Sequence, residues 1–76
     1  MDKAFVLINT DMGSEKEVTK SLKEIEEVKE VYSVYGIYDL VIRVEAESMK
    51  QLKGIISMKI RHLKNVRSTL TMIVIE

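Results

Sequence analysis

The segment Tyr35-Gly36-Ile37-Tyr38-Asp39 contains residue types that can hold a small charged molecule. A glycine permits backbone shapes that leave amides free for a ligand carboxylate, a tyrosine offers a flat wall, and an aspartate accepts from an ammonium group. These are the groups needed to bind a zwitterion such as a free amino acid. The alternative is that Gly36 and Asp39 only make a turn and that Tyr38 packs locally. These residues alone leave both interpretations open.

The rest of the sequence offers little catalytic or metal-binding chemistry. The one histidine, His62, stands among basic residues near an expected helix end, where it complements the helix dipole. With no cysteine there is no zinc knuckle, iron-sulfur cluster or thiol nucleophile. Thr10 and Asp11 are too few oxygen ligands for calcium, and the three glycines are isolated and form no phosphate loop. We therefore expect no enzyme activity, no cofactor and no metal.

Length and composition predict a single small folded domain over residues 1–76, with 46% hydrophobic and 32% charged residues. Twelve basic and twelve acidic residues balance, which argues against direct nucleic-acid binding. The start has no signal peptide, and no apolar run approaches the roughly 20 residues of a membrane span. We expect a cytoplasmic protein without membrane contact. The Lys- and Glu-rich charge, with little Asn or Gln, is typical of proteins from hot environments.

Hydrophobic periodicity predicts four strands and two helices. The first strand, residues 4–8, is followed by a helix that starts at Ser14, where Ser14 and Glu17 have capping-box spacing. Strands over 31–35 and 40–45 form a hairpin punctuated by Gly36. A second helix starts at Ser48, and a last strand covers 66–75. The apolar stripes of the two helices are Val18, Leu22, Ile25 and Val28, and Met49, Leu52, Ile56, Ile60 and Leu63.

This order of elements predicts an α+β fold of the ferredoxin-like βαββαβ type, a four-stranded antiparallel sheet with both helices on one face. Gly54 lies inside the second helix, where close packing on the sheet would explain its cost. The strands are apolar on both faces, yet two helices cover only one face. A monomer rarely exposes a large apolar patch, so we expect a homodimer that buries the other face in an α/β sandwich or barrel.

The whole chain resembles the effector-binding (RAM) domain of the Lrp/AsnC transcription regulators. The resemblance is carried by the first strand with Asn9 and Thr10, the phrase Val31-Tyr32-Ser33-Val34-Tyr35-Gly36-Ile37-Tyr38-Asp39-Leu40, and the ending Asn65-Val66-Arg67-Ser68-Thr69-Leu70-Thr71-Met72-Ile73-Val74. It implies an oligomeric domain, built from dimers into tetramers or octamers, that binds an amino-acid effector between dimers. It implies ligand contacts from Gly36, Ile37, Tyr38 and Asp39, with Thr69 and Thr71 as further candidates.

A full regulator of this family carries an N-terminal helix-turn-helix domain, whereas here the first strand starts almost at Met1. The resemblance therefore implies a stand-alone module that does not bind DNA itself and that modulates full-length regulators by co-assembly. An ACT-like amino-acid-sensing domain shares the strand order and is one alternative. A small dimeric ferredoxin-like enzyme is another, although the sequence offers no acid–base cluster for it. A purely structural oligomer is the third.

Overall fold

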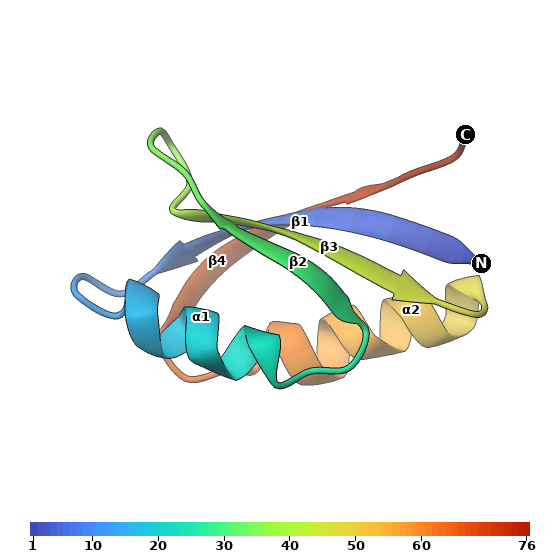
Figure 1. The fold of residues 1–76 in the computed structure, drawn as a ribbon, viewed down its shortest axis with the longest axis horizontal. Coiled ribbons are helices and arrows are strands. Elements are labelled where there is room, and N and C mark those ends of the chain that lie inside the picture. The colour runs from blue at the N-terminus through green and yellow to red at the C-terminus, as the bar shows by residue number, and fades with distance from the viewer.

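A four-stranded antiparallel sheet carries both helices on one face in the computed structural model, which describes residues 1–76 (Figure 1). The strands lie in the order β2-β3-β1-β4. The elements are β1 (Asp2–Thr10), α1 (Glu15–Lys23), β2 (Val28–Ser33), β3 (Leu40–Ala46), α2 (Met49–Ile55), the π-helical segment η1 (Ile56–Ile60) and β4 (Val66–Ile73). The predicted ferredoxin-like βαββαβ fold is confirmed.

Strict alternation along the two central strands divides the sheet into a buried face and an open face. Ala4, Val6 and Ile8 of β1 are fully buried beneath the helices, whereas Phe5 and Leu7 point to the other side and remain partly exposed. β3 alternates in the same way. Because successive side chains of a strand point to opposite faces, the pairing of β1 with β3 places like faces together.

The helices bury one apolar stripe each against the sheet. Val18 and Leu22 of α1 are buried, as are Leu52 of α2 and Ile56 and Ile60 of η1. With residues from β1, β2 and β3 they form a single core of 13 apolar side chains. Neither helix combines the length and the apolar character needed to cross a bilayer.

The open face of the sheet keeps an apolar centre that no part of the chain covers. We use the name open sheet face for the apolar side chains on this side, which come from all four strands: Phe5, Leu7, Tyr32, Val41, Leu70 and Met72. Tyr32, Leu70 and Met72 are about half exposed, at 50%, 47% and 49%. Figure 1 shows both helices on the opposite side of the sheet.

The first helix differs from its sequence prediction at both ends. Ser14 makes no side-chain cap, and Glu17 instead accepts a hydrogen bond from Asn65 Nδ2 at 3.3 Å, so the predicted capping box is wrong. Val28, assigned to the helix stripe, begins β2 and pairs with Val44. Position 28 is apolar whether it ends the helix or begins a strand, because its side chain enters the core in both cases. Helical spacing alone therefore could not distinguish a helix from a strand at Val28.

The second helix changes its winding halfway along. The amide of Arg61 donates to the carbonyl of Ile56 at 3.0 Å, an i→i−5 bond that widens the turn. Ile56 and Ile60 both stay buried against the sheet across this wide turn. The sequence predicted the stripe but not the π-helical winding.

The predicted explanation for Gly54 is also wrong. A Cβ built at Gly54 meets no atom within 4 Å, so close packing does not require a glycine there. Gly13 has equally open surroundings, but its φ is +81°, in the left-handed region that favours glycine.

We predict that Gly54→Ala stabilises the protein by about 0.5–1 kcal/mol, because alanine loses less backbone entropy in a helix and nothing blocks its methyl group. The matched control is Gly13→Ala, which adds the same methyl group at a positive φ and should destabilise. Thermal unfolding at one fixed protein concentration measures both. A lower unfolding midpoint for Gly54→Ala would contradict the open environment at this position.

Candidate functional site

The loop between β2 and β3, residues 34–39, stands out from the body of the protein. Figure 1 shows it rising on the side of the sheet away from the helices. Its base is closed by the amide of Val34, which donates to the carbonyl of Asp39 at 2.9 Å. Tyr35 is fully exposed and Ile37 is 87% exposed. The amides of residues 35–38 donate no hydrogen bond within the chain.

Asp39 fastens this loop to the end of β1. Its amide donates to the carbonyl of Ile8 at 3.0 Å, and its Oδ2 accepts from the amide of Thr10 at 2.9 Å and from Thr10 Oγ1 at 3.3 Å. Thr10 is the only buried polar residue, at 4% exposure. The Asp39 carboxylate therefore accepts hydrogen bonds at the end of β1, where the backbone hydrogen bonds between β1 and β3 stop. Its other oxygen, Oδ1, accepts no hydrogen bond within the chain.

A surface hollow of about 460 Å³ lies beside Asp39. We call it the hairpin groove, and its walls come from the end of β1, the start of α1, the β2–β3 loop and β4: Asn9, Thr10, Met12, Glu15, Ile37, Asp39, Arg67 and Ser68. Two carboxylates and one guanidinium share this space. The groove thus offers both signs of charge together with the apolar side chains of Met12 and Ile37.

Strand pairing brings the distant members of the groove together. Asn9 lies opposite Ser68, and Asn9 Nδ2 donates to Ser68 Oγ at 3.3 Å. The pairing of β1 and β4 shifts register between Asn9 and Thr10, an irregularity that bends the strand end. Glu15 comes from the first turn of α1, and its Oε1 accepts from Thr10 Oγ1 at 3.4 Å. Sequence reasoning missed Glu15, Arg67 and Ser68.

The structure brings together only part of the predicted site. Asp39 and Ile37 line the groove, while Gly36 and Tyr38 lie on the loop outside it. Thr69 pairs with Ile8, which also pairs with Leu40, so Thr69 lies two strand spacings from the loop, about 10 Å. Thr71 lines a different pocket, beneath η1. Within one chain, the two threonines and the loop form no common cavity.

A charged cluster borders the open sheet face on β2 and β3. Arg43 Nε donates to Glu30 Oε1 at 2.7 Å, and Arg43 also contacts the carboxylate of Glu45. The hydrogen bond from Arg43, assisted by one from Tyr32, lowers the pKa of Glu30. The hydrogen bond to Glu30 raises the pKa of Tyr32. Glu30 and Tyr32 therefore remain a carboxylate and a neutral phenol at neutral pH.

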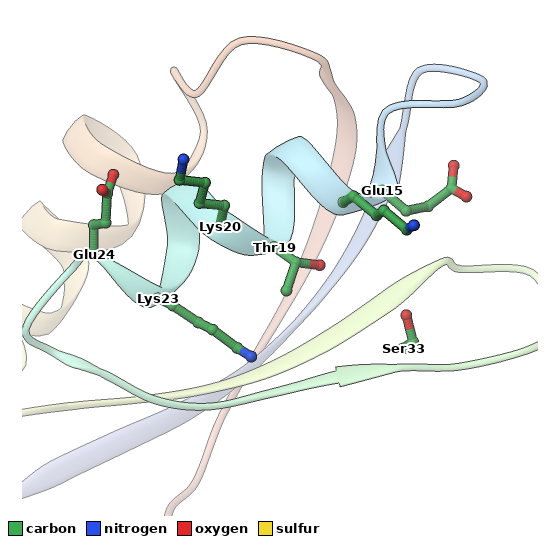
Figure 2. Close-up of a pocket in the computed structure, with 7 residues that line it drawn as sticks. Glu15, Thr19, Lys20, Lys23, Glu24 and Ser33 are labelled. Atoms are coloured by element: carbon green, nitrogen blue, oxygen red, sulfur yellow. The ribbon is translucent and has the colours of Figure 1, made fainter.

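A second hollow lies between α1 and β2. Thr19 of α1 and Ser33 of β2 point into the gap, whereas Lys20 and Glu24 point away from β2 (Figure 2). Its walls contain no apolar residue, and none of its charged side chains forms an ion pair. This is the ordinary solvated face of an amphipathic helix. The hairpin groove is the better candidate for a ligand site.

Comparison with known proteins identifies the family of this chain. The Lrp/AsnC ligand binding domain model matches residues 3–76. No curated protein is significantly similar in sequence. Among solved structures, FFRP-DM1 is 45% identical with a TM-score of 0.95, and the alignment covers 99% of this chain and 100% of that chain. The hypothetical protein PHS023 from Pyrococcus horikoshii is also 45% identical, with a TM-score of 0.93 and coverage of 100% and 92%.

A third structure contains a ligand. The feast or famine regulatory protein from M. tuberculosis, complexed with L-methionine, is 32% identical with a TM-score of 0.83. The match covers 100% of this chain and 51% of that chain. The three solved structures share the fold of this chain. The chain belongs to the Lrp/AsnC ligand-binding domain family.

We predict that Asp39→Ala destabilises the fold by about 1–3 kcal/mol, because the buried amide of Thr10 loses its acceptor. Asp39→Asn is the matched control, since an amide oxygen can still accept from Thr10 and only the charge is lost. Denaturant unfolding at fixed protein concentration compares the variants. Equal stability of Asp39→Ala and Asp39→Asn would contradict a structural role for this oxygen.

Proposed function

We propose that this domain is a regulatory module that binds a free amino acid in the hairpin groove and couples binding to the assembly of its copies. The observation that carries the proposal is the presence of both signs of charge around one hollow, with Asp39, Glu15 and Arg67 all lining it. A free amino acid carries both charges on adjacent groups. The family membership supports the same ligand class.

The charged groups assign the two ends of the ligand. Asp39 Oδ1 is free of donors within the chain and can accept from the ligand's ammonium group, while Oδ2 keeps its bonds to Thr10. Arg67 forms no ion pair within the chain, and its planar fork suits a carboxylate. Ser68 beside it offers a further hydroxyl.

The exposed apolar residues of the groove favour a ligand with an apolar side chain. Met12 is 99% exposed and Ile37 is 87% exposed, and both line the hollow. Burying them against a ligand would remove apolar area from water. Since a 32% identical relative is complexed with L-methionine, methionine is the first ligand to test.

Assembly follows from the two surfaces that a single chain leaves uncovered. The open sheet face suits a second copy packed face to face, because a symmetric pair buries the same patch on both chains. The loop tip, with exposed Tyr35 and free amides, suits contact with a further copy. A ligand held beside the tip would then stabilise the assembly to which it binds more tightly.

We predict saturable binding of L-methionine by calorimetry, weakened by about ten-fold or more in Arg67→Gln and in Asp39→Asn, since each loses one charge-assisted bond. Methioninol, which lacks the carboxylate, is the matched ligand control and should bind the wild type as weakly as methionine binds Arg67→Gln. If none of the twenty amino acids binds, the proposed ligand class is wrong. Unchanged affinity in both variants would show that the amino acid binds outside the hairpin groove.

We predict that Met72→Asp on the open sheet face reduces the solution mass to that of one chain, because a charge would be buried in the pairing surface. Met58→Asp is the matched control: Met58 is 72% exposed on η1, on the helix side of the sheet. Light scattering over a range of protein concentrations measures both, with circular dichroism as a check of folding. A monomeric wild type, or equal masses for the two folded variants, would contradict pairing through this face.

A further inference from the structure

The net charge is zero, but basic and acidic residues are unevenly distributed along the chain. Residues 48–75 contain six lysines and arginines and no acidic residue, whereas the other 48 residues contain the remaining six and all twelve acidic residues. Of the six, only Lys59 forms an ion pair, with Glu27 at 3.5 Å. The basic residues of α2, η1 and the start of β4 therefore lack counter-charges within the chain.

Part of this excess charge surrounds a pocket of about 270 Å³ between the second helix and β4. We call it the basic pocket, and it is lined by Lys53, Ile56, Ser57, Arg61, Thr71 and Ile73. The lining contains two cationic residues and two residues with hydroxyls, and no carboxylate; Ser57 Oγ donates to the carbonyl of Gly54 at 3.5 Å. Ile56 and Ile73 supply its apolar part.

The π-helical winding explains why these side chains share one face. In a regular α-helix, a residue eight positions further on lies about 80° around the axis. The wide turn, closed by the Arg61 amide on the Ile56 carbonyl, reduces this offset. Lys53, Ser57 and Arg61 thus follow one another at four-residue intervals along the edge of β4. Such local winding often accompanies functional sites.

Thr71 supplies an independent observation beside this pocket. Its Oγ1 is buried and has no hydrogen-bond partner, the one side-chain atom of the protein in this state. Buried hydroxyls are almost always satisfied, so the exception calls for an explanation. β4 is an edge strand, and because Val74 donates inward to Lys3, alternation directs the amide of Thr71 toward the free edge.

We propose that the basic pocket binds the phosphate group of a small phosphomonoester. A phosphomonoester carries about −1.5 to −2 charges at neutral pH and three acceptor oxygens, which match two cations and two hydroxyls without an acid. The guanidinium of Arg61 can take two oxygens in its fork and Lys53 a third. The buried Thr71 hydroxyl, which has no partner within the chain, reaches the ligand by a rotation about χ1. Ile56 and Ile73 receive the carbon part of the ligand. This site is separate from the hairpin groove.

The test is calorimetry on the full chain with inorganic phosphate and glycerol 3-phosphate, with acetate as the carboxylate probe, all at one ionic strength set with sodium chloride. We expect saturable binding of both phosphates and tighter binding of the ester. Arg61→Gln should weaken the affinity by about ten- to a hundred-fold. Lys50→Gln is the matched control, because Lys50 is unpaired on the same helix but does not line the pocket, and it should change the affinity less than two-fold.

Thr71→Val separates ligand binding from a structural role. Valine keeps the shape and removes the unpaired hydroxyl, so the unfolding midpoint of the free protein should stay the same or rise while phosphate affinity falls. The proposal is overturned if phosphate does not bind saturably, if acetate binds as tightly, or if Arg61→Gln and Lys50→Gln lose the same affinity. It is also overturned if Thr71→Val binds phosphate as the wild type does.

Discussion

The whole molecule depends on a sheet that its own helices cover on one face only. Strict alternation along β1 and β3 sends every second side chain into the core, which fixes the register of the central pair. The remaining side chains gather on the open sheet face, and the chain has no further element to cover them. The uncovered sheet face follows from this arrangement, in which two helices cover one side of a four-stranded sheet. The helix side of the sheet is therefore a packed core, whereas the opposite face stays exposed.

Asp39 both stabilises the end of β1 and lines the hairpin groove. One carboxylate oxygen satisfies the buried end of β1, where the ladder would otherwise leave the amide of Thr10 unpaired. The other oxygen accepts no hydrogen bond within the chain, and Asp39 lines the groove. Because the residue is held by its backbone and by one oxygen, the second oxygen has a fixed direction. At the proposed ligand site, a carboxylate held in this way would reduce the ordering cost of binding.

Sequence reasoning predicted the fold because periodicity and element order are local signals. It also predicted that Ile37 and Asp39 lie at a hairpin tip, since such a tip is readable from its turn residues, and both residues line the hairpin groove. It missed Glu15, which enters the groove from the first turn of α1. It also missed Arg67, because Arg67 reaches the groove only through the pairing of β1 with β4 and the register shift after Asn9. The capping box failed for the same kind of reason: Asn65, far away in sequence, binds Glu17. Contacts of this type join residues that are far apart in the sequence, so local sequence patterns do not reveal them.

The π-helical turn makes the second helix tolerant of a change in chain length. Removing one residue between Ile56 and Ile60 would restore regular α-helical winding at little cost to the backbone, because both windings satisfy its hydrogen bonds. Arg61 would then stand seven positions after Lys53, and seven residues of regular α-helix turn by about 700°, close to two full turns. A single-residue deletion at this place would therefore keep the fold and keep Arg61 on the side of the helix that faces β4. Relatives whose second helix is one residue shorter would then share both the architecture and this basic face.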